Sequence, residues 1–196
     1  MAERYEIPVV ARGVSKQRAA VRPLHSSIPD MGTAPEYMPK IDCAPKSAEF
    51  LKWFGDSKVR DSDGAPLICF HGTSAASKKF ANRGRGPFAQ FGFWFAVERK
   101  EVHRFVYSQR SIQPLNIIPV YLCIKNPKEF HNNDELKAVA EGKFGPTPTA
   151  QFRKLRIDLL KEGFDGAVIR NTHSNDQSES WVAFKPSQIR SAIACE

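Results

Sequence analysis

Hydrophobic and polar positions follow two different periods along this chain, which predicts a mixture of short strands and helices. Apolar runs of strand length occur at residues 66–70, 91–95, 117–124 and 181–184. Apolar positions recur every three or four residues over 98–107 and 152–161, the spacing of an amphipathic helix. Strands and helices do not alternate strictly, so the pattern predicts an α+β fold of split, largely antiparallel β-sheets with short flanking helices.

Capping and turn residues refine this pattern. Ser47 is placed to cap a helix over residues 48–54, which Gly55 would end. Pro119 lies inside an apolar run and predicts a strand edge or a bulge there, because proline has no N–H to donate. Residues 74–90 are rich in lysine, arginine, glycine and serine, so we expect a mobile loop.

The chain divides into two parts by composition. Residues 1–45 contain six prolines and show weak periodicity, which predicts a flexible N-terminal arm. Residues 46–196 are expected to form the folded domain. With 196 residues, of which 41% are hydrophobic, the chain can build one sizeable core.

Charge and apolar content limit the partners. The net charge of +8 fits a solvated basic surface, or one that attracts a dinucleotide pyrophosphate or a nucleic acid. The loop Arg83–Gly86 has the same two interpretations, a solvated loop or a pyrophosphate clamp. No apolar stretch approaches the roughly 20 residues that span a bilayer, and no secretory signal is visible. We expect no membrane partner and a cytoplasmic location, or delivery into a host cell by a specialised secretion system.

The cysteines and histidines do not predict a metal site. None of the four cysteines forms a Cys-x-x-Cys pair, and Cys69 and Cys123 lie in apolar runs, where reduced core thiols are expected. The five histidines show no His-x-x-x-His spacing. We therefore expect no bound metal.

Three motifs carry candidate chemistry. The polar triplet His71-Gly72-Thr73 directly follows the first apolar run, at the expected end of a strand. Alternation places Trp94 on the face opposite its two phenylalanine neighbours, and Glu179 precedes the last strand. A histidine, an aromatic ring and an acid on three strands indicate a split NAD-binding cleft. The plainer interpretation is a structural histidine and a core tryptophan.

Five segments, in this order, resemble the ADP-ribosyltransferase domains of phage polyvalent proteins and of related bacterial toxins and effectors. They are residues 53–59, residues 64–67 together with 70–73, and residues 93–96, 163–166 and 179–189. The resemblance covers residues 47–193 and extends to the branch of the superfamily that contains diphtheria toxin and the poly(ADP-ribose) polymerases. It implies NAD as the substrate and the split antiparallel fold of these enzymes.

The resemblance also implies roles for particular residues. In that branch the histidine of a His-Gly-Thr or His-Gly-Ser triplet binds the adenosine ribose of NAD, the next glycine holds the nicotinamide amide, and two aromatic side chains stack on the nicotinamide. These roles fall, in chain order, on His71, Gly72, Trp94 and Phe105. Thr73 completes the NAD-binding triplet. Tryptophan and phenylalanine replace the branch's two tyrosines, a change that keeps the stacking surface.

The catalytic acid falls near the start of the last strand. The resemblance puts Ser180 where the branch has its glutamate, and Glu179 one position earlier, on the opposite face of a regular strand. A bulge would turn Glu179 inward, and Gln177-Ser178-Glu179 also resembles the Gln-x-Glu turn of clostridial Rho-modifying exoenzymes. We predict Glu179 as the catalytic acid and Ser180 as an NAD-binding neighbour. The alternatives are Asp176 as the acid, or an inactive binder.

These features predict an NAD-dependent mono-ADP-ribosyltransferase of toxin, effector or phage origin. Its acceptor is an unknown macromolecule, and we expect a protein rather than a nucleic acid. The alternative is a catalytically weak or inactive module on the same fold that binds NAD or a partner. A nucleic-acid-binding domain is a third possibility, supported only by the charge of +8.

Deleting residues 1–45 is expected to leave the melting temperature and NAD cleavage close to those of the full-length chain. The prolines and weak periodicity of this arm give it little apolar surface to bury. Thermal denaturation and nicotinamide release measure the two properties. A large drop in either would mean that the arm packs against the domain.

Overall fold

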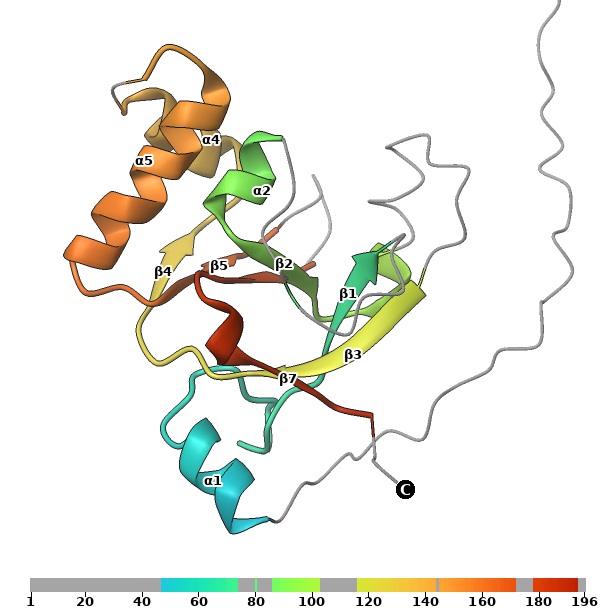
Figure 1. Cartoon of the computed structure of the whole chain (residues 1–196). Helices are drawn as coiled ribbons and strands as arrows, with labels where there is room; N and C mark the ends of the chain where they lie inside the picture. The colour runs from blue at the N-terminus through green and yellow to red at the C-terminus, as the bar shows by residue number, and fades with distance from the viewer. Residues whose placement is uncertain are drawn as a thin grey trace, which may run out of the picture. The chain divides into compact units, whose positions relative to one another are not determined.

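The structure, a computed structural model, describes residues 47–73, 80, 86–102, 116–143, 145–171 and 178–193. Its helices are α1 (Ala48–Phe54), α2 (Pro87–Phe91), α4 (Asn133–Glu141) and α5 (Pro148–Lys161), and residues 99–102 are also helical. Its strands are β1 (Cys69–Thr73), β2 (Phe93–Ala96), β3 (Asn116–Leu122), β4 (Pro127–Phe130), β5 (Gly166–Ile169), β6 (Ser180–Ala183) and β7 (Ile189–Ser191), with the 3-10 turn η1 (Pro186–Gln188) before β7 (Figure 1).

The described strands form one sheet that is almost divided at its centre. Their order is β4-β5-β6-β2-β1-β3-β7, and every neighbouring pair is antiparallel except β4 and β5. β2 pairs with β6 along its whole length, and β1 does the same with β3. In contrast, β1 and β2 meet only at Phe70 and Ala96. The expected α+β fold of split, largely antiparallel sheets is confirmed.

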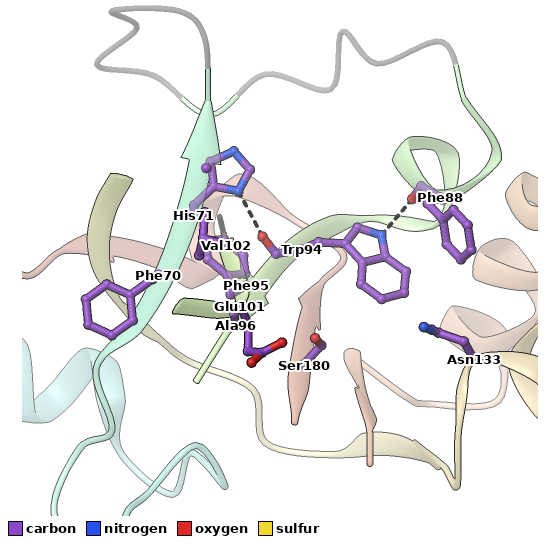
Figure 2. A pocket seen from close by; sticks show the side chains of 11 residues that line it. Phe70, His71, Phe88, Trp94, Phe95, Ala96, Glu101, Val102, Asn133 and Ser180 are labelled. Carbon is purple, nitrogen blue, oxygen red and sulfur yellow. Dashed lines mark hydrogen bonds between the residues drawn. The ribbon is translucent and has the colours of Figure 1, made fainter. Parts of the chain in front are cut away.

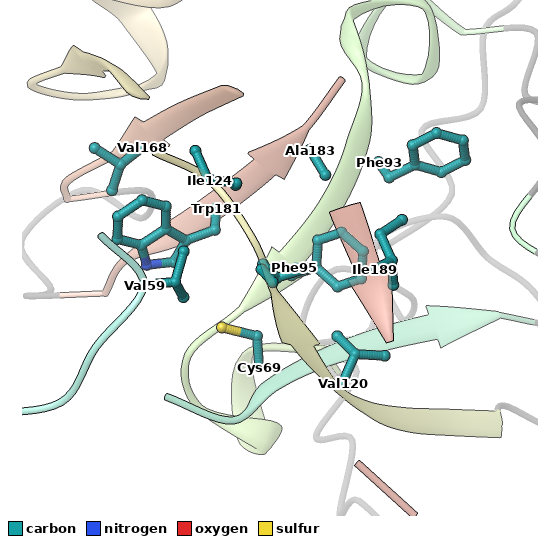
Figure 3. Packing of buried hydrophobic residues seen from close by; sticks show 11 residues of the cluster. Val59, Cys69, Phe93, Phe95, Val120, Ile124, Val168, Trp181, Ala183 and Ile189 are labelled. Atoms are coloured by element: carbon teal, nitrogen blue, oxygen red, sulfur yellow. The ribbon is translucent and has the colours of Figure 1, made fainter. Parts of the chain in front are cut away.

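Two apolar clusters cover the two faces of the sheet. One joins α2, α4 and α5 to the β4, β5 and β6 strands through Phe91, Phe130, Leu136, Phe152, Leu155, Ile169 and Val182. The other fills the opposite face with Cys69, Phe95, Val120, Ile124, Val168 and Trp181 (Figure 3). Burying one such aliphatic or aromatic side chain contributes about 1.5–3 kcal/mol, so these clusters hold both halves of the sheet in place.

Strand β2 shows the alternation that its sequence predicts. Phe93 and Phe95 belong to the cluster that contains Cys69, whereas Trp94 packs against the helix-covered cluster on the other face. Trp94 therefore projects to the side on which α2 and α5 lie, and its neighbours anchor the strand from behind.

Local signals at α1 and β3 are confirmed. The Ser47 hydroxyl accepts from the Phe50 N–H at 3.1 Å, and the helix ends at Gly55, whose φ is 50°. β7 pairs with residues 120–122 of β3, and the next N–H, of Ala192, donates to the Pro119 carbonyl oxygen at 3.0 Å, so the described pairing on this side of β3 ends at Pro119.

The His71-Gly72-Thr73 triplet closes β1, as its place at the expected end of a strand predicts, and it pairs with residues 116–118 of β3. Another boundary differs from the prediction. The mobile loop predicted over residues 74–90 is wrong for its last part, where α2 begins at Pro87. Pro87 suits a first helical position, and Phe88 packs edge-on against Phe152 of α5, a contact that local sequence does not reveal. Residues 74–79 and 81–85 lie outside the described residues.

Strand β4 and helix α4 fall in a region for which the pattern predicts no element. β4 is only four residues long and contains two charged residues, and it forms because it pairs in parallel with β5. A parallel pair needs a long crossover, which α4 and α5 supply. β4 and α4 therefore depend on contacts with distant segments, which the local sequence pattern does not reveal.

Gly166 lies where β5 passes closest to its neighbours. A Cβ at this position would be 2.7 Å from Ile124 Cγ2 and 2.8 Å from the Val182 carbonyl oxygen. Gly166→Ala is therefore expected to lower the free energy of unfolding by about 1–3 kcal/mol, the usual effect of overpacking. Gly86→Ala is the control, because nothing lies within 4 Å of a Cβ there. Urea denaturation compares the two, and equal stabilities would contradict the prediction.

Candidate functional site

A cleft opens where β1 and β2 separate. Continuing their antiparallel register from Phe70 and Ala96 would bring Gly72 opposite Trp94, but the described ladder stops at the first pair. The His71 imidazole occupies the gap instead, with its Nδ1 2.8 Å from the Trp94 carbonyl oxygen (Figure 2). A side chain thus replaces the backbone partner that a continuous sheet would supply.

A cavity of about 160 Å³ lies at this gap. Strands β1, β2 and β6, helices α2 and α4, and the helical residues 99–102 all contribute to its wall. The lining residues are Phe70, His71, Gly72, Phe88, Trp94, Phe95, Ala96, Glu101, Val102, Asn133 and Ser180. Four residues predicted to bind NAD, on three different strands, therefore line one cavity: His71, Gly72, Trp94 and Ser180.

His71 is held in one protonation pattern. A carbonyl oxygen only accepts hydrogen bonds, so Nδ1 carries the proton that it donates to Trp94, and Nε2 of the neutral ring keeps its lone pair. Burial holds the pKa of His71 below the ordinary value of 6.5, and the hydrogen bond to the Trp94 carbonyl partly opposes this shift. At neutral pH the side chain therefore offers an acceptor at Nε2.

Trp94 is fixed as one wall of the cavity. Its indole Nε1 donates to the Phe88 carbonyl oxygen at 2.8 Å, and its ring meets the Phe88 ring edge-on with 5.3 Å between centroids (Figure 2). The hydrogen bond and the ring contact together restrict the indole to one orientation. A flat ligand ring entering the cavity would meet a surface already in position.

Ser180 and Glu101 bring polar groups to the same cavity. Ser180 pairs directly with Ala96, and Ala96 with Phe70, so these three side chains share one face of the sheet. Glu101 comes from the helical turn that follows β2, where its N–H donates to the Glu98 carbonyl oxygen at 3.1 Å. Its side chain is buried, and among the described lining residues it is the one carboxylate.

Glu179 lies outside the cavity lining. Its Oε1 accepts from Trp181 Nε1 at 2.6 Å, and its Oε2 pairs with Arg170, which also contacts Glu129 at 3.2 Å. The ladder continues regularly past Ser180, because the Val97 N–H donates to the Glu179 carbonyl oxygen at 3.2 Å. The catalytic role of Glu179 stays a prediction from sequence.

Other predicted residues lie elsewhere. Thr73 ends β1 opposite Asn116 and does not line the cavity. Phe105, Asp176 and the arginines of the Arg83–Gly86 loop are outside the described residues.

Sequence reasoning missed Glu101, although a signal was available. In the helix predicted over residues 98–107, Glu101 comes four positions before Phe105, and residues four apart share a helix face. Phe88 and Asn133 were missed for a different reason. They belong to α2 and α4, helices that the pattern does not predict.

The described residues offer no metal cluster. No three or more histidine, cysteine, aspartate or glutamate side chains among them are placed to hold an ion. Cys69 is a buried free thiol, and Cys123 donates its thiol proton to the Trp53 carbonyl oxygen at 3.1 Å. No described helix is long and apolar enough to cross a membrane.

The lowered pKa of His71 predicts a pH dependence of stability. The unfolded chain binds a proton at His71 more readily than the folded protein does. The contribution of His71 to the free energy of unfolding is therefore fully present above pH 6.5, and it is lost as pH falls through the pKa that His71 has in the folded protein. Urea midpoints are expected to fall between about pH 8 and about pH 5 more steeply for the wild type than for His71→Gln. Parallel curves would rule out this role for His71.

The comparisons with known proteins agree with this geometry. Residues 61–195, more than half of the chain, match the family described as ADP-ribosyltransferase in polyvalent proteins. No curated protein and no solved structure matches the chain significantly. The matched segment includes all the described residues that line the cavity. The chain therefore belongs to the family of ADP-ribosyltransferase domains found in polyvalent proteins.

Proposed function

We propose that this protein is an NAD-dependent mono-ADP-ribosyltransferase that binds the nicotinamide end of NAD in the cavity between β1 and β2. One observation carries the proposal: His71 and Gly72 of β1, Trp94 of β2 and Ser180 of β6 line a single cavity. The family match over residues 61–195 supports the same activity.

The cavity supplies the contacts that such a substrate needs. The indole of Trp94 offers a flat surface on which the nicotinamide ring can stack. His71 Nε2 offers an acceptor for a ribose hydroxyl, because Nδ1 is already committed to the Trp94 carbonyl. Four aromatic side chains at the wall limit water around the bond that breaks: Phe70, Phe88, Trp94 and Phe95.

The reaction itself needs little proton transfer. Cleavage of the bond between nicotinamide and ribose C1′ moves positive charge from the nicotinamide ring to the ribose, as in glycoside cleavage. Nicotinamide leaves as a neutral base, so no general acid is required. A carboxylate near C1′ would stabilise the charge that develops there.

The acceptor is a macromolecule in this proposal, and a protein rather than a nucleic acid. The net charge of +8 favours an acidic acceptor surface through long-range attraction. The name of the family, which refers to polyvalent proteins, fits a phage-related enzyme or an effector delivered into another cell.

A binding module without turnover is the second candidate. Two observations favour it: Ser180 lines the cavity where the related enzymes have a glutamate, and Glu179 is engaged by Arg170 and Trp181. Such a module would bind NAD without releasing nicotinamide.

Incubation of the full chain with labelled NAD and cell lysate separates these candidates. A transferase releases nicotinamide and labels a macromolecule, whereas a binding module gives NAD affinity in calorimetry without either product. Salt-sensitive binding to nucleic acid without NAD binding would reject both candidates. Digestion of the labelled product with protease or nuclease identifies the class of acceptor.

Replacing Trp94 tests the stacking surface. Trp94→Ala is expected to weaken NAD affinity at least about tenfold, whereas Trp94→Phe keeps it within about threefold, because the aromatic area carries the contact. Calorimetry measures affinity, and NAD should quench tryptophan fluorescence in the wild type but far less in Trp94→Phe. Equal affinity of Trp94→Ala and the wild type would place the nicotinamide elsewhere.

A further inference from the structure

We propose that Glu101 is the catalytic carboxylate of this site, a role for which sequence predicts Glu179. The assignment rests on the proposed transferase function, because it concerns the same cavity. It moves the acid from Glu179, the residue before strand β6, to the helical turn after β2.

The placement of Glu101 carries the proposal. Its side chain is only 5% exposed, yet it lines the cavity together with His71, Trp94 and Ser180. Figure 2 shows its carboxylate directed toward the Ser180 side of the cavity. A carboxylate is rarely this buried in a wall made mostly of apolar side chains, because removing it from water is costly. Among the described lining residues Glu101 is thus the one carboxylate at the cavity, and this placement indicates a chemical use.

The backbone fixes Glu101 in relation to the cleft. Ala96 ends β2 opposite both Phe70 and Ser180, the row of residues at which β1 and β2 part. The Val97 N–H then donates to the Glu179 carbonyl oxygen, and the helical turn begins with the bond from Glu101 N–H to Glu98. Glu101 thus lies in the first helical turn after Ala96, where β1 and β2 separate, and its side chain lines the cavity.

Glu179 is held for a different purpose. Its carboxylate is shared between the Arg170 guanidinium and the Trp181 indole, and Trp181 packs in the cluster on the face opposite Ser180. To reach the cavity, the Glu179 carboxylate would have to release Arg170 and Trp181 and move to the opposite face of the sheet. This geometry fits a carboxylate that ties β5 to β6.

The proposed step balances without a further reactant. The C1′–N bond of NAD breaks, its electron pair stays on the nicotinamide nitrogen, and the ribose becomes oxocarbenium-like beside the Glu101 carboxylate. The acceptor's hydroxyl, amine or carboxylate then bonds to C1′. If the acceptor atom carries a proton, Glu101 accepts it and passes it to solvent. The low polarity of the wall strengthens the attraction between Glu101 and the developing charge.

Glu101→Gln in the full chain tests the assignment, with Glu98→Gln as the matched control. Glu98 is exposed, lies one turn earlier and pairs with Lys100. At saturating NAD, Glu101→Gln is expected to lower nicotinamide release on the order of 10²–10³-fold, the usual effect of losing a transition-state contact. Its NAD affinity should stay within about threefold and its melting temperature near the wild type, since the carboxylate acts mainly on the developing charge. Glu98→Gln should match the wild type in all three measurements.

Glu101→Asp provides the second variant if Glu101→Gln proves unstable. It keeps the charge but draws the carboxylate back by one methylene, so turnover should fall about tenfold yet exceed that of Glu101→Gln. Wild-type turnover in Glu101→Asp, or turnover of Glu101→Gln within about threefold of the wild type, would overturn the assignment.

Two further outcomes separate this inference from the proposed function. A large loss of turnover in Glu179→Gln, with NAD binding intact and Glu101→Gln active, returns the role to Glu179 and leaves the transferase function standing. Absence of nicotinamide release from the wild type, with any acceptor supplied, overturns the transferase function and the role of Glu101 together. Calorimetry with NAD then distinguishes a binding module from a protein that does not recognise NAD.

Discussion

The separation of β1 from β2 after one residue pair is the constraint on which the site depends. Phe70 and Ala96 join the two halves of the sheet, and the His71 imidazole then takes the place of the next backbone partner of Trp94. Unpaired backbone groups inside a protein are costly, so this opening persists because a side chain satisfies the exposed carbonyl. The same contact orients the imidazole and leaves its Nε2 as an acceptor.

The remainder of the fold keeps this opening rigid. Phe93 and Phe95 fix β2 from behind, while Trp94 is held from the front by Phe88 of α2. α2 packs in turn on α5, the second helix of the crossover between β4 and β5. A cavity wall supported on both faces reorganises little when charge develops inside it, which is the condition under which fixed dipoles and carboxylates are most effective.

The two acidic candidates differ in what surrounds them. The Glu179 carboxylate forms an ion pair with Arg170 and accepts a hydrogen bond from the Trp181 indole, so it contributes to the link between β5 and β6. Glu101 is buried at the cavity with Ser180 across from it. A cavity can therefore keep a carboxylate in its wall while a serine occupies the strand position, because a neighbouring element brings the acid to the same space. Catalysis requires the placement of a charge and does not depend on which element carries it.

Sequence alone determined the α+β class, the helix capped by Ser47, the alternation of Trp94 with its neighbours, and the set of His71, Gly72, Trp94 and Ser180. The first three follow from local physics, namely strand and helix periods and a capping hydroxyl, whereas the last set follows from the resemblance of its motifs to the ADP-ribosyltransferase family. Tertiary structure decided what depends on contacts between distant segments. It formed β4 and α4 through pairing with β5, made α2 a helix against α5, and brought Glu101 to the cavity while Arg170 and Trp181 engaged Glu179. Neighbouring residues on a strand face opposite sides, so only the observed register and its partners decide which of two adjacent polar residues lines the cavity.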